Sequence, residues 1–223
     1  MSSTASPGAG RPEVAGPGDL ARLLAALDAG QVVALPTDTV YGLAARIDRP
    51  GALAQIFEAK GRPPDLALPV LVGRTAQVHE VASVWPDMAK TLADRIWPGA
   101  LTLVVPATEI GRHLGGDGRT VGVREPKDRW LRSLLRKVGP LAVTSANPHG
   151  LPPATTSAEV VSAFDGGLVA LVMEGGTCDG VPSTVVDCTG DEPGCLRQGA
   201  VEWTRIEASL AMQARRRRFV RRR

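Results

Sequence analysis

Residues 31–43 read QVVALPTDTVYGL and decide the fold. Residues 31–35 are apolar and rich in valine, which is typical of a short buried strand. The strand ends at Pro36, because proline lacks the N–H group that a central strand needs. We predict that residues 36–43 form a loop at this strand end. Leucines at 20, 23, 24 and 27 have helical spacing and Gly30 is a natural helix stop, so a helix over residues 19–29 precedes the strand.

The same alternation of amphipathic helices and short apolar strands continues along the chain. It predicts an α/β domain with a mixed β-sheet flanked by helices. At 223 residues and 43% hydrophobic content, the chain is long enough for one such domain. The further strands are expected near residues 68–72, 101–105, 120–123, 142–144, 168–172 and 184–187, and the further helices near 51–60, 87–96, 126–137, 157–164 and 205–214.

The positive charge of the chain is concentrated at its C-terminal end. The formal charge is +3, but residues 215–223 hold seven arginines, and without them 19 basic residues face 23 acidic ones. We predict a disordered Ala/Gly/Pro-rich extension over residues 1–17, a catalytic domain over 18–204, and a helix with an arginine-rich tail over 205–223. The tail is interpreted either as a solvated terminus or as a contact for RNA.

Cysteine usage and hydropathy indicate a soluble, cytoplasmic protein with no membrane partner. Cys178, Cys188 and Cys195 are odd in number and form no CxxC pair, so we expect reduced thiols. No apolar run approaches the roughly 20 residues that span a bilayer, and the N-terminal stretch lacks the apolar core of a secretory signal. Aromatic residues make up only 4% of the chain, which argues against a base-stacking RNA platform.

Small polar residues gather just past the ends of predicted strands, at residues 37–39, 144–147 and 182–184. Strand-end loops are where α/β folds build ligand sites. Hydroxyl and amide groups there could bind an amino acid or a nucleotide without adding charge. The alternative is that these residues only form turns and caps.

Four cations stand at the ends of predicted elements. Lys60 and Arg62 close a helix, where they either complement its dipole or clamp phosphates beside the stiff Pro63–Pro64 segment. Arg124 and Arg197 follow apolar stretches, where an arginine is paired either with an internal carboxylate or with an anionic ligand. The chain has no GxSxG motif and no phosphate-binding P-loop, and its three histidines lie in unrelated contexts, so histidine-dependent catalysis is not expected.

Seven motifs between residues 30 and 201 resemble, in order, those of the YrdC-like family, the threonylcarbamoyl-AMP synthases. The resemblance implies a twisted mixed sheet with a concave, positively charged active-site face, in the short single-domain form of the family. The motifs are PTDTVYGL (36–43), KGRP (60–63), WPGALTLV (97–104), VGVR (121–124), TSAN (144–147), PSTVVD (182–187) and LRQGA (196–200).

The resemblance also implies a reaction. ATP, L-threonine and bicarbonate give L-threonylcarbamoyl-AMP and pyrophosphate, and a tRNA-modifying transferase complex then uses the product to make N6-threonylcarbamoyladenosine in tRNA. By position, L-threonine is expected near Thr39, Arg124, Ser145 and Ser183, with Arg124 on its carboxylate. ATP is expected near Lys60, Arg62, Thr120, Asn147, Thr155 and Arg197. Lys60 and Arg62 are the expected catalytic cations, and Mg²⁺ is expected with the triphosphate rather than on protein side chains.

The sequence departs from the family pattern at several positions, which leaves other functions to be weighed. Leu66–Ala67 and Gln198 replace residues common in the family, which affects an expected ATP contact, and Asp128 stands where histidine is frequent. One alternative is a non-catalytic module that binds double-stranded RNA or tRNA, although small polar strand-end residues are not what backbone-phosphate binding requires. A carbamoyl-phosphate-using relative is a second alternative, but such proteins carry cysteine-rich zinc modules that this chain lacks.

Overall fold

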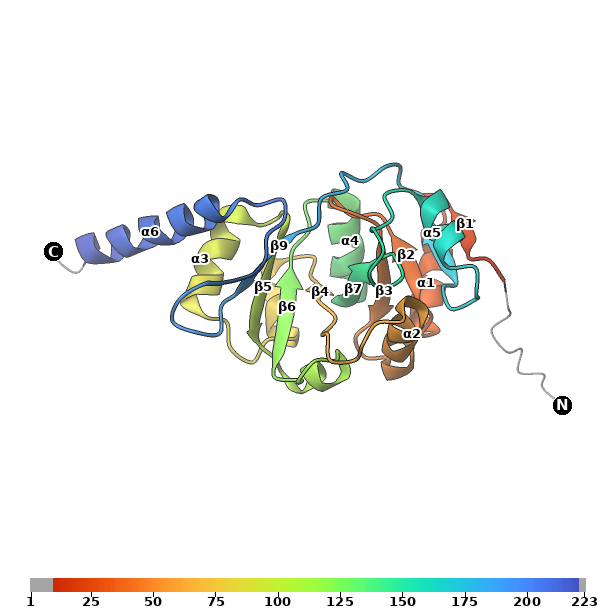
Figure 1. Cartoon of the computed structure of the whole chain (residues 1–223), viewed down its shortest axis with the longest axis horizontal. Helices are drawn as coiled ribbons and strands as arrows, with labels where there is room; N and C mark the ends of the chain where they lie inside the picture. The colour runs from red at the N-terminus through yellow and green to blue at the C-terminus, as the bar shows by residue number, and fades with distance from the viewer. Residues whose placement is uncertain (1–9, 221–223) are drawn as a thin grey trace.

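The computed structural model describes residues 10–220, which fold into one mixed sheet covered by helices (Figure 1). The mixed α/β architecture predicted from the sequence is confirmed. The strands are β1 (Glu13–Ala15), β2 (Val33–Leu35), β3 (Gly42–Arg46), β4 (Val70–Leu71), β5 (Leu101–Pro106), β6 (Thr120–Arg124), β7 (Leu141–Ser145), β8 (Leu171–Met173), β9 (Thr184–Asp187) and β10 (Gly194–Arg197). The α-helices are α1 (Leu20–Asp28), α2 (Pro50–Lys60), α3 (Asp87–Ile96), α4 (Arg129–Val138), α5 (Ser157–Ala163) and α6 (Trp203–Val220), with 3₁₀-helices at Thr75–Glu80 and Glu109–His113.

The ten strands form a single sheet in the order β1-β8-β2-β3-β7-β4-β6-β5-β9-β10. Parallel pairs join β1 to β8, β2 to β8, β4 to β6 and β5 to β9, and the remaining neighbours are antiparallel. Strands that are distant in sequence therefore lie side by side in the middle of the sheet. This arrangement makes β3, β7, β4, β6, β5, β9 and β10 one continuous run of neighbouring strands.

The central strands are buried on both faces because helices cover both sides of the sheet. Alternate residues of β2 illustrate this, since Val33 belongs to one hydrophobic cluster and Ala34 to the other. Leu27 of α1 and Leu135 of α4 pack with Val33, while Ile56 of α2 packs in the cluster of Ala34. A strand buried on both faces reads as a continuous apolar run, which explains why residues 31–35 were recognisable in the sequence.

β3 corrects the prediction that residues 36–43 form only a loop. The chain reverses within residues 36–41, and β3 then pairs antiparallel with β2, with Leu35 opposite Gly42, and with β7, with Gly42 opposite Ser145. Its sequence, GLAAR, has no β-branched or aromatic residue, so intrinsic propensity does not indicate a strand. Pairing on both sides decides its conformation.

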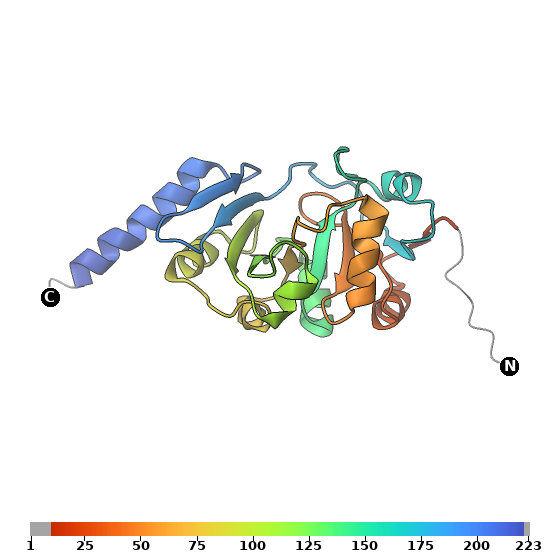
Figure 2. The ribbon, with the colours of Figure 1, turned by 60° about the horizontal axis from the view of Figure 1, so that its bottom comes forward.

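Both ends of the described chain also differ from the prediction. Residues 13–15, placed in a disordered extension, form β1 and pair in parallel with β8, while residues 1–9 lie outside the described residues. β10 was not predicted and forms the opposite sheet edge. The C-terminal helix was expected to end near residue 214, but α6 continues to Val220 and its distal part leads away from the body (Figures 1 and 2). Across residues 10–220, no helix is long and apolar enough to cross a membrane.

Candidate functional site

A cavity of about 180 Å³ lies over the middle of the sheet and is lined by residues of β3, β4, β5, β6, β7 and β10 and of the loops beside them. Its wall combines hydroxyl groups, arginines and small apolar side chains. Six of the residues predicted to bind substrates line it. The lining residues are Thr37, Thr39, Val40, Gly42, Arg62, Pro69, Leu71, Thr102, Arg124, Val143, Thr144, Ser145, Pro153, Pro182, Ser183 and Arg197.

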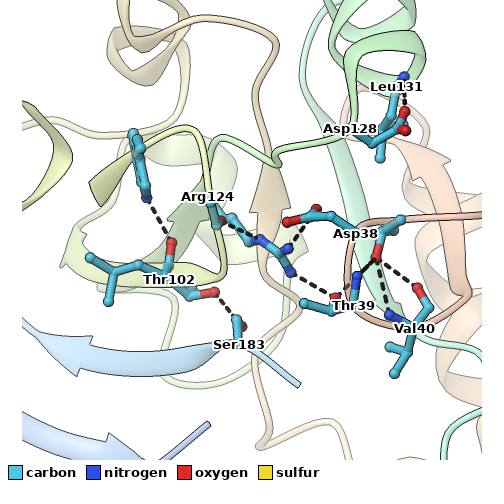
Figure 3. A network of polar contacts seen from close by, with 12 residues as sticks. Asp38, Thr39, Val40, Thr102, Arg124, Asp128, Leu131 and Ser183 are labelled. Atoms are coloured by element: carbon cyan, nitrogen blue, oxygen red, sulfur yellow. Dashed lines mark hydrogen bonds and ion pairs between the residues drawn. The ribbon is translucent and has the colours of Figure 1, made fainter. Parts of the chain in front are cut away.

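Arg124 reaches across the cavity from the end of β6 to the loop after β2 (Figure 3). Its Nη2 donates to Oδ1 of Asp38 at 2.7 Å, and its Nη1 donates to Oγ1 of Thr39 at 3.0 Å. The Nε group donates to the carbonyl oxygen of Gly99 at 2.9 Å. Burial lowers the pKa of Arg124, and the Asp38 carboxylate opposes that shift. Of the two partners that the sequence left open for Arg124, the internal carboxylate is therefore present.

The loop that carries Asp38 is held by the side chain of Thr37. Its Oγ1 accepts hydrogen bonds from the backbone N–H groups of Thr39 and Val40, at 3.1 and 3.2 Å, and lies 2.7 Å from the carbonyl oxygen of Val40. The start of β3 requires glycine at position 42. A Cβ atom there would lie 2.5 Å from Cγ1 of Val143 in the neighbouring strand, so only glycine permits this close approach.

Ser183 and Arg197 form the opposite wall of the cavity. Oγ of Ser183 lies 2.8 Å from Oγ1 of Thr102, with which it shares a hydrogen bond. Arg197 donates through Nε and Nη2 to the carbonyl oxygen of Ser183, at 3.1 and 2.9 Å, and through Nη2 to its Oγ at 3.2 Å. These contacts fix the segment before β9 against β5 and present two hydroxyl groups to the cavity.

Three arginines, Arg62, Arg124 and Arg197, line the cavity. Within the described part of the chain, no aspartate or glutamate does. Burial and the nearby charge of Arg197 lower the pKa of Arg62, while burial and Arg124 lower that of Arg197. A concentration of partly buried guanidinium groups of this kind favours a carboxylate or phosphate ligand.

Arg62 is held by backbone groups at the position where the sequence departs from the family pattern. Its Nε donates to the carbonyl oxygen of Leu66 at 3.1 Å, and its Nη2 donates to that of Ala67 at 3.0 Å. Backbone carbonyls exist whatever side chain occupies these positions. The Leu66–Ala67 departure therefore leaves the anchoring of Arg62 intact.

Lys60 lies beneath the cavity rather than in its wall. The side chain is only 3% exposed, and Nζ donates to the carbonyl oxygens of Ser145 and Asn147, at 2.5 and 2.6 Å, with Oδ1 of Asn147 at 3.4 Å. Burial, with a smaller effect from the charge of Arg62, lowers the pKa of Lys60 to about 8. Lys60 therefore joins α2 to the segment after β7, which carries Ser145.

Besides Lys60, three further expected ATP contacts lie outside the cavity wall. Asn147 contacts Lys60 and donates to the carbonyl oxygens of Pro148 and Leu151. Thr155 donates from its N–H and hydroxyl groups to Glu159 at the start of α5. Thr120 stands at the opposite end of β6 from Arg124, about 13 Å away at the usual rise per strand residue. Contacts of these residues with ATP stay predictions.

Two polar residues of the site were not singled out from the sequence. Asp38 lies within the predicted polar loop at residues 37–39, and its pairing with Arg124 joins positions 86 residues apart, which periodicity cannot reveal. Thr102 did leave a signal. It is the one polar residue in the strand sequence LTLVVP, and in an alternating strand a buried threonine beside leucines marks the face that turns toward a polar site.

Comparison with known proteins agrees with this geometry. The Sua5_yciO_yrdC family model, described as "Telomere recombination", matches residues 25–199. The chain belongs to this family. The resemblance drawn from its seven motifs is thereby confirmed.

Known relatives match this chain over most of its length. It is 39% identical over 194 residues to Threonylcarbamoyl-AMP synthase of Bacillus subtilis, covering 86% of this chain and 56% of that protein. It is 40% identical over 191 residues to Putative threonylcarbamoyl-AMP synthase of Mycobacterium tuberculosis, covering 85% of this chain and 88% of that one. The structure of Sua5 of P. abyssi complexed with L-threonine superposes with a TM-score of 0.83 at 35% identity, covering 88% of this chain and 60% of that chain. The chain thus spans little more than half of the B. subtilis relative.

Proposed function

We propose that this protein is an L-threonylcarbamoyladenylate synthase. It joins L-threonine, bicarbonate and ATP into L-threonylcarbamoyl-AMP and releases pyrophosphate, supplying the threonylcarbamoyl group for a tRNA modification. The observation that carries the proposal is the composition of the cavity wall, where three arginines and several hydroxyl groups stand together and, among residues 10–220, no carboxylate joins them. Such a wall suits substrates that bring a carboxylate, a carbamate and a triphosphate.

The proposed reaction needs charge stabilisation and positioning rather than a protein nucleophile. Bicarbonate converts the threonine amine into a carbamate with loss of water, and a carbamate oxygen then attacks the α-phosphorus of ATP as pyrophosphate leaves. Arg124 binds the threonine carboxylate, beside the hydroxyl groups of Thr39, Ser145 and Ser183. Arg62 and Arg197 face the developing phosphate charge, where guanidinium groups in a partly buried site are most effective.

The metal expected with ATP has no set of protein ligands in the described residues. Among residues 10–220, no group of three or more His, Cys, Asp or Glu side chains could hold a metal ion. Hard cations such as Mg²⁺ take oxygen ligands and often bind mainly through substrate phosphates. We therefore propose that Mg²⁺ enters with the triphosphate and offsets its charge, which leaves the three arginines as the protein's own contribution.

Pyrophosphate release tests the proposal directly. The purified chain is incubated with ATP, Mg²⁺ and bicarbonate, without amino acid, with L-threonine, and with L-serine. Threonine-dependent release of pyrophosphate, together with a product carrying both AMP and threonine by mass spectrometry, is expected. Absence of release from a folded protein whose melting temperature neither ATP nor L-threonine raises would contradict the proposal and favour the RNA-binding alternative.

We further propose that the arginine-rich end of the chain contacts tRNA. The reaction itself takes place in the cytoplasm and does not require this end of the chain. Residues 215–218 and 221–223 are arginines, and the helix that carries the first four leads away from the sheet (Figure 2). Deletion of residues 213–223 should leave threonine-dependent pyrophosphate release unchanged. It should weaken tRNA binding and flatten its salt dependence, because fewer phosphate-bound cations are displaced. Equal binding by the full-length and shortened chains would exclude this contact.

A further inference from the structure

We propose that Asp38 is a positioning residue that fixes the plane of the Arg124 guanidinium, and thereby the binding of the amino-acid carboxylate. The inference rests on the proposed function, because it assigns the carboxylate of the substrate to Arg124. It concerns a residue that does not itself line the catalytic cavity. Asp38 acts on the substrate only through Arg124.

The contacts of Arg124 account for three of its five N–H groups. Asp38 and Thr39, adjacent in the loop after β2, each accept one, and the carbonyl oxygen of Gly99 accepts the third from a separate segment (Figure 3). Two N–H groups, one on each terminal nitrogen, have no acceptor among the described residues. Because the guanidinium is planar, holding three of its N–H directions fixes the other two. The two remaining N–H groups are thereby held in fixed directions, available to an anionic ligand such as a carboxylate.

Asp38 is the strongest of the three acceptors. It is the only charged one, and its contact with Nη2 is the shortest of the three, at 2.7 Å. The Arg124 side chain is buried and that of Asp38 is nearly so, at 6% and 14% exposure. Water therefore screens the pair little, and rotation of Arg124 away from Asp38 would separate two poorly hydrated charges.

The position of Asp38 separates the positioning role from direct substrate contact. Its side chain borders a neighbouring cavity lined also by Asp128, Glu174 and Asp179, on the other side of the Thr37 loop. Thr37 and Thr39, on either side of Asp38 in the sequence, line the catalytic cavity, whereas Asp38 does not. The Asp38 carboxylate thus holds Arg124 without lining the space in which the substrate is proposed to bind.

Steady-state kinetics of Asp38→Ala and Asp38→Asn test this role. In Asp38→Ala the guanidinium loses its charged anchor, so KM for L-threonine should rise at least about tenfold, while KM for ATP changes less than about twofold. Asp38→Asn keeps an oxygen acceptor at the same place, and its KM for L-threonine should rise clearly less. Asp48→Ala is the matched control, because Asp48 pairs with Arg46 at the surface, and its kinetics should equal those of the wild type.

The direction of the change decides between positioning and its alternatives. If Asp38 only competes with the substrate for Arg124, both variants would show a lower KM for L-threonine. An unchanged KM in a less stable Asp38→Ala protein would leave Asp38 with a role in folding alone, and an equal rise in both variants would make the charge rather than the geometry decisive. Each of these results would overturn the proposal. A wild-type protein without threonine-dependent pyrophosphate release would instead overturn the proposed function.

Discussion

Arg124 and Lys60 are both buried cations beside the same cavity, but their charges are stabilised in different ways. Arg124 is 5% exposed and faces the Asp38 carboxylate, whereas Lys60 is 3% exposed and faces only the carbonyl oxygens of Ser145 and Asn147 and the side-chain oxygen of Asn147. Carbonyl dipoles satisfy the hydrogen bonds of an ammonium group without cancelling its charge. Burial consequently lowers the pKa of Lys60 to about 8.

Arg124 and Lys60 therefore contribute to the site in two different ways. The Asp38–Arg124 pair fixes a cation that faces the cavity, and an arginine keeps its charge across the pH range in which proteins stay folded. Lys60 holds backbone segments together from beneath, and its charge can be titrated at mildly alkaline pH. Removing either cation, or changing the pH, should therefore affect the protein in distinguishable ways.

The largest effect is expected for Arg124→Met. The substitution leaves the Asp38 carboxylate without its counter-charge, which typically costs at least about 3 kcal/mol when a buried pair is broken. Urea denaturation should show this loss in the free energy of unfolding, and threonine-dependent activity should disappear. Arg46→Met removes a more exposed arginine that pairs with Asp28 and Asp48, and it should cost less than about 1 kcal/mol. Equal losses in the two variants would show that Asp38 does not depend on Arg124.

A smaller loss is expected for Lys60→Met. Two backbone carbonyls lose their donor, at about 1–3 kcal/mol for each unsatisfied group, but the cost of burying an ammonium charge disappears at the same time. The net loss in the free energy of unfolding should be about 1–2 kcal/mol by urea denaturation. A loss exceeding that of Arg124→Met would contradict the distinction between the two cations.

The pH dependence of stability should identify Lys60. Below about pH 8 it is charged in both the folded and the unfolded chain, and folding bears the full cost of burying it. Between about pH 8 and its ordinary pKa of 10.5 only the unfolded chain keeps the proton, so the free energy of unfolding should rise with pH. The contribution is up to about 1.4 kcal/mol per pH unit.

The measurement is urea denaturation of the wild type and both variants from pH 7 to 10. Lys60→Met should lack the rise attributed to Lys60, and Arg124→Met should retain it. If the free energy of unfolding rose with pH at the same slope in the wild type and in Lys60→Met, Lys60 would not be the titrating group.

The smallest effect is expected for Thr39→Val. Valine keeps the shape of threonine but removes the neutral oxygen that accepts from Nη1 of Arg124, while Asp38 and Gly99 still hold the guanidinium. Stability should fall by about 1 kcal/mol, the usual contribution of a neutral hydrogen bond. KM for L-threonine should rise less than in Asp38→Ala. If KM for L-threonine rose more in Thr39→Val than in Asp38→Ala, Thr39 rather than Asp38 would be the main positioning residue.

The parts of the fold that could be predicted are those with a local signal. The strand at residues 33–35 is a continuous apolar run ending at a proline, and α1 has regular leucine spacing, so both were found. β3 was missed because its small residues form a strand only through pairing with β2 and β7. β1 and β10 are short edge strands, whose pairing depends on the rest of the sheet rather than on their own composition.

The same division applies to the candidate site and to the molecule as a whole. The sequence by itself determined the family, the mixed α/β architecture and six of the residues that line the cavity, because these depend on residue types in a fixed order. Only the tertiary structure decided that Asp38 holds Arg124 and that Lys60 lies beneath the cavity, since these contacts join positions 86, 85 and 87 residues apart. Burial and pairing then set the charge behaviour of each cation, and neither property exists until the strands are assembled.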